Sequence, residues 1–162
     1  MIDSEIVALE LPADSNLILG QSHFIKTVED LYDVLVSSAP GIKFGLAFCE
    51  ASGPRLVRHS GNDRELEDAA VRNLQKVGAG HCFLVYVRNA FPINLLPAIK
   101  QCPEIVRIFC ATANPLQVVV ATTSQGRGVL GVIDGEPPLG VEDEQDRKQR
   151  RDFLRKIGYK ET

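Results

Sequence analysis

The chain has 162 residues, of which 44 % are apolar and 24 % charged, and its formal net charge is −3. These values are typical of one soluble globular domain, and they exclude a largely disordered chain, a collagen-like chain and a small disulfide scaffold. The longest apolar runs, such as Cys82–Val87, fall far short of the roughly 18–20 residues of a membrane span. The acidic balance does not favour nucleic acid as a partner.

The cysteine pattern indicates thiols in a core rather than a metal or disulfide site. No CxxC occurs, and no Cys/His pair has the spacing of zinc ligands. Three of the four cysteines lie in apolar segments, where a free thiol packs as a small hydrophobe. The first residues carry no cationic start before an apolar core, so we expect no signal peptide. We expect a reducing, cytoplasmic location and no bound metal.

The first third of the chain predicts two strands and a helix. The apolar runs 4–10 and 16–20 predict strands that could pair as a hairpin. Thr27 is a good N-cap residue, and the acidic residues that follow it suit the first turn of a helix. Pro40-Gly41 should end this helix.

The next segments predict a hairpin, a helix and the strongest strand. Residues 43–50 and 55–59 flank a Gly-Pro turn and should pair. Asn62 or Asp63 should cap an amphipathic helix that stops at Gly78, the usual position for a C-terminal glycine. Residues 81–88 are nearly all apolar, so we place this strand in the centre of the sheet.

The last third predicts one helix, three strands and a charged helix. Pro92 can start a helix that runs to about Gln101. Residues 104–111 and 116–123 predict a third hairpin, a Gly-rich loop follows, and 129–133 is the last strand. The neutral but highly charged tail predicts a solvated helix at about 143–157. We therefore predict a single α/β domain over residues 1–162, with a mixed β-sheet that contains several hairpins and is covered by helices.

His81 is the most informative candidate for chemistry. It follows Gly78-Ala79-Gly80 and opens the central strand, where flexible glycines expose backbone N–H donors to a ligand. A histidine there could hold a phosphoryl group or act as a general base. A helix stop followed by a hydrogen-bonded histidine remains the alternative. His23 and His59 precede predicted helices, where unpaired N–H groups can bind anions.

Polar residues at the ends of predicted strands are candidates for ligand binding. Loops at strand ends carry binding groups in α/β proteins, and amides suit the edge of a purine. The Gly-rich loop 125–128 matches neither a Walker A nor a Rossmann motif, but its arginine could grip a phosphate. Turn and cap chemistry is the alternative at each position. The candidate binding residues are Glu50, Gly80, Arg88, Asn89, Thr112, Asn114, Gln125, Arg127, His23 and Lys43.

Six long segments carry a resemblance to a known family. They are GQSHFIKTVEDLY, PGIKFGLAFCEASGPRLVRHSGND, AGHCFLVYVRNAFPINLL, IFCATANPLQVVVA, QGRGVLGVIDG and RRDFLRKIGYK. The chain resembles the adenosine-specific kinase family of archaea and bacteria from about Ile18 to Tyr159.

The resemblance implies a phosphotransferase that binds adenosine or an adenine nucleotide and carries a phosphoryl group on a histidine. The match to the Gly-His at the head of the central strand places that histidine at His81. ATP or another adenine nucleotide is the candidate donor, and Mg²⁺ is a candidate accompanying ion. The resemblance also implies a homo-oligomer, a trimer or a hexameric ring. It implies neither a nucleic-acid nor a membrane partner.

Two other functions stay open at this point. The chain could be a non-catalytic sensor of adenosine or AMP whose histidine phosphorylation is incidental. It could also be an interaction protein that makes contacts through its charged C-terminal helix.

Overall fold

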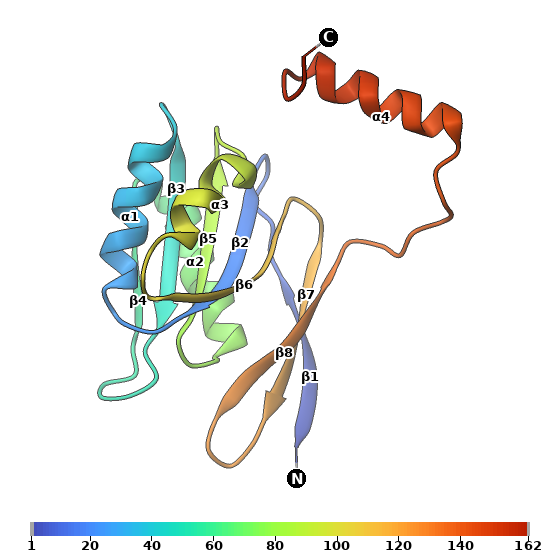
Figure 1. Cartoon of the computed structure of the whole chain (residues 1–162). Coiled ribbons are helices and arrows are strands. Elements are labelled where there is room, and N and C mark those ends of the chain that lie inside the picture. The colour runs from blue at the N-terminus through green and yellow to red at the C-terminus, as the bar shows by residue number, and fades with distance from the viewer. Residues whose placement is uncertain (1, 162) are drawn as a thin grey trace.

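The structure, a computed structural model, describes residues 2–161 as an α/β domain with two β-sheets and a C-terminal arm (Figure 1). Three helices lie against the sheets, and the fourth stands apart from them. The elements are β1 (Asp3–Leu9), β2 (Asn16–Ser22), α1 (Thr27–Ser38), β3 (Lys43–Cys49), β4 (Val57–Gly61), α2 (Arg64–Val77), β5 (Cys82–Arg88), α3 (Pro92–Lys100), β6 (Ile105–Thr112), β7 (Leu116–Thr122), β8 (Arg127–Asp134) and α4 (Glu144–Lys156).

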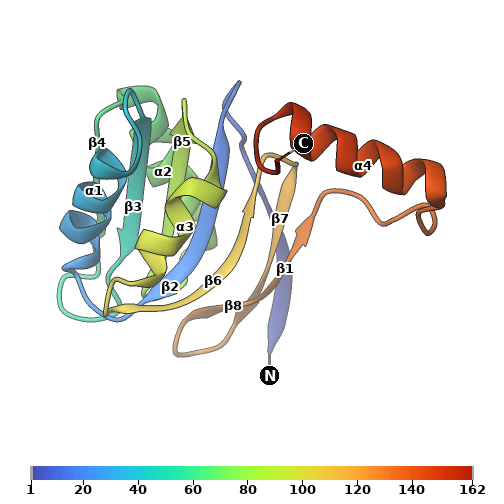
Figure 2. The same cartoon turned by 45° about the horizontal axis from the view of Figure 1, so that its top comes forward.

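The larger sheet has five strands in the order β4-β3-β5-β2-β6. Every neighbouring pair is antiparallel, and β5 lies in the middle. Helices α1 and α3 pack on one face, where Leu31, Leu35 and Leu95 meet Phe44 and Phe83 in one buried cluster. Helix α2 packs on the other face. The two faces therefore have separate cores, and the central strand contributes to both. Figure 2 shows these helices on opposite sides of the larger sheet.

The smaller sheet has the order β1-β7-β8 and is also antiparallel. Its inner face shares a core with α2, because Val7, Val118 and Val120 belong to the same buried cluster as Leu66 and Leu74. Alternation along β7 turns every second residue away from this core. No helix among residues 2–161 is long and apolar enough to cross a bilayer.

The structure confirms the α/β class, the single domain and many of the predicted local signals. Asp63 caps α2 by accepting the Leu66 N–H at 3.1 Å, and Gly78 ends it in the left-handed region at φ 57°. The β3–β4 hairpin forms as predicted. Helix α3 starts at Pro92 and accommodates Pro97. Helix α4 spans Glu144–Lys156.

Other predictions about pairing and capping are wrong. Residues 4–10 and 16–20 do not form a hairpin, because β1 pairs with β7 and β2 pairs with β5 and β6. Strands β6 and β7 also lie in different sheets. All the strand pairs are antiparallel and divided between two sheets, so no single mixed sheet forms. Thr27 is the first residue of α1 rather than its cap, and its hydroxyl donates to the Phe24 carbonyl at 2.5 Å.

Gly45 of β3 lets α2 lie directly on the sheet. A Cβ at this position would lie 2.0 Å from the Glu67 backbone nitrogen and 2.2 Å from the Leu66 carbonyl carbon. Both atoms belong to the helix backbone, which cannot turn aside as a flexible side chain could. The close approach of α2 therefore depends on the missing side chain.

A buried carboxyl group lies where β6 begins beside α1. Glu104 is only 7 % exposed, and its Oε1 atom has no hydrogen-bond partner among residues 2–161. Burial and the neighbouring Asp30 carboxyl raise the pKa of Glu104 above its usual value, while Lys26 opposes the shift. The charged form of Glu104 is therefore unfavourable in the folded chain.

We predict that Gly45→Ala strongly destabilises the fold. The added methyl group would force α2 away from β3, and overpacking of this kind costs about 1–3 kcal/mol or more. Thermal or urea unfolding measures the change. Gly128→Ala is the control, because a Cβ there meets nothing within 4 Å. Equal stabilities of the two variants would contradict this account of the α2 contact.

We also predict that Glu104→Gln raises the thermal midpoint at pH 7 by a few degrees but not at pH 3.5. Because the folded-state pKa of Glu104 is raised, its contribution to stability falls as pH increases above the ordinary pKa. Glutamine removes the ionisation and offers N–H donors to Asp30. Melting curves over this pH range test the prediction, and an equal gain at both pH values would contradict it.

Candidate functional site

His81 is held by backbone bonds at the head of the central strand. Its N–H donates to the Cys49 carbonyl of β3, and its carbonyl accepts the Ser22 N–H of β2, both at 2.8 Å. Its φ of 63° lies in the left-handed region, which is uncommon for a residue with a side chain. Gly80 permits this path, because a Cβ there would lie 3.0 Å from the Cβ of Ala51. Both flanking strands thus fix the backbone of His81.

The His81 ring lies among other rings on the face of the sheet that α1 covers. It stacks on Phe48, with ring centroids 5.8 Å apart and planes 16° apart. The His23 ring meets it edge-on at 6.4 Å, with planes 87° apart. His81 is half-buried and His23 is exposed. Two imidazoles from different loops therefore lie next to each other, edge to face, beside the Phe48 ring.

An arginine and a carboxylate lie next to the Phe48 ring. Arg58 of β4 stands directly opposite Phe48 in the strand register. Its Nη2 atom lies 2.9 Å from Oε1 of Glu50, and the Glu50 Oε2 atom accepts the Leu56 N–H at 2.9 Å. These bonds, first the Leu56 N–H and then Arg58, lower the pKa of Glu50 despite partial desolvation. Glu50 is therefore an ionised group that orients the guanidinium.

One donor of Arg58 is left without a partner. Its Nε atom is buried, and it is one of two such unpaired side-chain N or O atoms among residues 2–161. The side chain as a whole is 38 % exposed. A buried guanidinium N–H without an acceptor is costly. A guanidinium that a carboxylate holds in place can bind an anionic oxygen through its exposed N–H groups.

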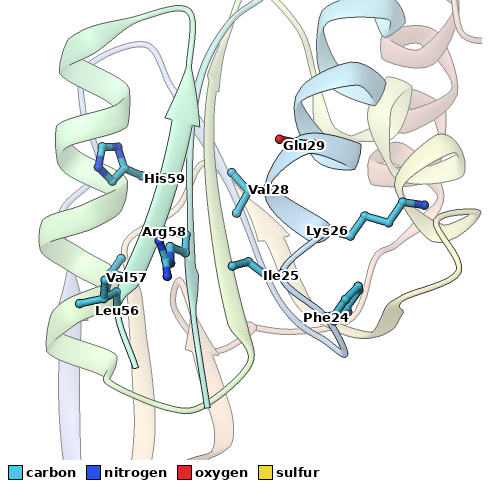
Figure 3. Close-up of a pocket in the computed structure, with 9 residues that line it drawn as sticks. All are labelled: Phe24, Ile25, Lys26, Val28, Glu29, Leu56, Val57, Arg58 and His59. Atoms are coloured by element: carbon cyan, nitrogen blue, oxygen red, sulfur yellow. The ribbon is translucent and has the colours of Figure 1, made fainter. Parts of the chain in front are cut away.

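Arg58 lines a cavity of about 710 Å³ between the start of α1 and β4 (Figure 3). Figure 3 shows Arg58 facing Ile25 and Val28, whereas His59 projects from the other side of β4. The His59 Nδ1 atom lies 2.6 Å from Glu67 Oε1 of α2. Apolar walls with few polar groups are typical of ligand sites. The full lining is Phe24, Ile25, Lys26, Val28, Glu29, Leu56, Val57, Arg58 and His59.

A second cavity of about 710 Å³ lies where the β3–β4 loop approaches the β7–β8 turn and the end of α2. Leu56 and Val57 line both cavities. Of the predicted binding residues, Glu50, Gly80, Gln125 and Arg127 line the second one. The segment that follows Glu50 therefore separates two hollows, and Gly80, the residue before His81, lines the second one.

Arg127 serves the fold rather than an open phosphate site. Its Nε and Nη2 atoms donate to the carbonyls of Val77 and Lys76 at 3.0 and 3.1 Å, and Nη1 donates to the Thr122 hydroxyl and pairs with Glu5. A cation at the C-terminus of a helix is favourable because the last carbonyls lack partners. Arg127 thus caps α2.

Five predicted binding residues lie at the opposite end of the larger sheet. Lys43 and Arg88 pair across β3 and β5, and β5 spans about 20 Å at the usual rise per residue. Arg88 grips Glu65 through two N–H groups at 3.0 and 3.2 Å. Asn89 donates to the Gly41 carbonyl at 3.2 Å. These three positions do not converge with His81.

Thr112 and Asn114 hold a loop in place at that same end. The Thr112 hydroxyl donates to Asp134 Oδ1 at 2.7 Å, and the Asn114 side chain donates to the same oxygen at 3.2 Å. Thr112 also accepts the Asn114 N–H at 2.9 Å. The alternative of turn chemistry therefore describes their observed bonds.

The sequence reasoning missed Arg58, Phe48 and Phe24 as possible site residues. An arginine in the polar run Arg58-His59-Ser60 looks like an ordinary solvent-facing position. The available signal was the carboxylate Glu50 at the far side of a short hairpin, a position that can pair with Arg58.

Among residues 2–161, no three His, Cys, Asp or Glu side chains gather as ligands for a metal.

Comparisons with known proteins agree with this fold. The crystal structure of the PH1918 protein from Pyrococcus horikoshii OT3 is similar to the chain, with a TM-score of 0.96 and 45 % sequence identity over 100 % of both chains. No curated protein matches. The family model described as adenosine-specific kinase matches residues 7–160. This match covers nearly the whole chain, and the chain therefore belongs to the adenosine-specific kinase family.

Proposed function

We propose that the chain is a phosphotransferase that binds adenosine or an adenine nucleotide and passes a phosphoryl group through His81. Family membership supports the kinase-like activity and the adenosine ligand. The observation that best supports this role of His81 is the position of its ring, which stacks on Phe48 beside the His23 ring. Arg58, the residue opposite Phe48, has an unpaired donor and lines a cavity.

The cavity between α1 and β4 suits a nucleoside with a phosphate. Phe24 and Leu56 are 55 % and 51 % exposed and offer apolar surface for a base. Arg58 supplies positive charge for phosphate oxygens, whereas Lys26, which also lines the cavity, pairs with Asp30 at 3.3 Å. Glu50 holds the Arg58 guanidinium in place, so the side chain loses little conformational entropy when an anion binds.

The proposed transfer has two balanced steps. A neutral imidazole nitrogen of His81 attacks the terminal phosphorus of a nucleoside triphosphate, and the N–P bond forms as the P–O bond to the diphosphate breaks. A hydroxyl of adenosine then attacks the phosphorus, the N–P bond breaks, and the hydroxyl proton passes to His23. Charge stabilisation and positioning dominate phosphoryl transfer, and in this proposal Arg58 stabilises the charge while the stacked ring of His81 is held in position.

We predict that the purified protein, after incubation with a nucleoside triphosphate, gains about 80 Da that brief acid treatment removes. His81→Asn should abolish the gain and the turnover, since asparagine tolerates the left-handed backbone but has no imidazole. Intact-mass spectrometry measures the adduct. Lys43→Gln, in β3 beside the far end of β5, is the control that should keep it. An adduct that persists in His81→Asn would overturn the proposed role of His81.

The alternative of a non-catalytic sensor gives a different result in the same assay. It requires nucleoside binding without a His81-dependent steady-state rate. A thermal shift with adenosine but no turnover above background would favour the sensor. A steady rate that disappears in His81→Asn would exclude it.

We predict that Arg58→Gln weakens binding of AMP at least about tenfold and leaves adenosine affinity within about twofold. A hydrogen bond to a charged group contributes about 1.5–3 kcal/mol, and about 1.4 kcal/mol corresponds to a factor of ten. Adenosine lacks the phosphate, so it loses nothing. Calorimetric titration of both ligands measures the difference, with Lys43→Gln as the control. Equal losses for the two ligands would show that Arg58 does not bind the phosphate.

A further inference from the structure

The C-terminal arm, residues 136–161, stands apart from the rest of the described chain. No residue of α4 is buried. Within the described part of the chain, the side-chain hydrogen bonds and ion pairs of α4 join residues of the arm to one another. Figure 1 shows the chain leaving β8 in an extended segment and carrying α4 away from both sheets. An isolated helix of this length is only marginally stable in water, so a packing partner would stabilise α4.

The arm presents an apolar surface. Phe153 and Ile157 are 58 % and 45 % exposed, and their spacing of four residues puts them on one face of the helix end. Leu139 and Val141 in the extended segment are almost fully exposed. The opposite face of α4 carries Lys148, Arg151 and Arg155, by helical spacing.

The outer face of the smaller sheet is also apolar and uncovered. Ile6 of β1 pairs with Val119 of β7, and both point away from the core that holds Val7 and Val118. Ile133 pairs with Gln117 on the same side. Leu130 lies at the irregularity in β8 and is 67 % exposed. One-sided antiparallel sheets usually turn polar residues to water, so this face is typical of a contact surface.

We propose that the arm of one chain docks on the outer face of the smaller sheet, defined by Ile6, Val119, Leu130 and Ile133, of a second copy. The chain carries both halves of the contact, an apolar arm without a partner and an apolar sheet face without a cover. The arm holds seven acidic and seven basic residues, so it lacks the net positive charge that would favour an anionic lipid surface or a nucleic acid. The extended segment 135–143 reaches at most about 30 Å, enough to bridge adjoining copies.

A contact of this kind joins two different surfaces. Each copy can give its arm to one neighbour and accept an arm from another, or two copies can exchange arms reciprocally. Head-to-tail contacts that close on themselves produce rings. The proposal does not depend on nucleotide binding or on His81.

Light scattering coupled to size-exclusion chromatography tests the proposal with the full-length chain. Phe153→Glu/Ile157→Glu should disable the arm, and Leu130→Glu should disable the face; each should lower the oligomer mass at least twofold. Arg151→Gln/Arg155→Gln is the matched control, because it makes the same charge change on the other side of α4 and should keep the parent mass. All these positions are outside the core, so melting midpoints should stay close to that of the parent.

Mixing the two disabled variants provides the decisive measurement. The Leu130→Glu chain still has an intact arm, and the Phe153→Glu/Ile157→Glu chain still has an intact face, so the mixture should form a complex that neither forms alone. A monomeric parent chain would overturn the proposal. An arm variant with the full oligomer mass, or a mixture without a new complex, would overturn it as well.

Discussion

The antiparallel pairing of β5 with both β2 and β3 is the constraint on which the candidate site depends. In such a sheet the start of one strand meets the ends of its two neighbours. His81 precedes β5, and its backbone therefore bonds to Cys49 at the end of β3 and Ser22 at the end of β2. Glu50 and His23 follow those two ends in the chain. One short backbone segment thus gathers groups from three separate parts of the sequence.

The same pairing explains which parts of the site could be predicted. His81 stood out because glycines precede it and an apolar strand follows it, and both signals are local. The grouping of Arg88 and Thr112 with His81 assumed that strand ends converge, which holds at one edge of a parallel sheet. In this antiparallel sheet β5 and β6 leave their C-terminal ends about 20 Å from His81, at the usual rise per residue. The elements were predictable from local patterns, whereas their partners depended on long-range pairing.

The three arginines considered as phosphate ligands differ in how many of their donors are satisfied. Arg88 grips Glu65 with two N–H groups and the Ala13 carbonyl with a third. Arg127 is bound to the end of α2 and to Glu5. Arg58 is oriented by Glu50 and retains a buried N–H without an acceptor. The unsatisfied donor, which sequence patterns cannot show, sets Arg58 apart from the two arginines that tie the fold together.

The arm shows how a segment without a core of its own can still be prepared for binding. Asp143 and Asp146 form a capping box, with bonds of 2.8 and 3.0 Å that satisfy two backbone N–H groups at the start of α4. Lys148 pairs with Asp152 one turn later, and Glu142 pairs with Arg150. Each exposed pair adds little to stability, but each favours the helix before any contact forms. A preformed helix loses less conformational entropy on docking. More of the favourable free energy of the apolar contact made by Phe153 and Ile157 would therefore remain as binding affinity.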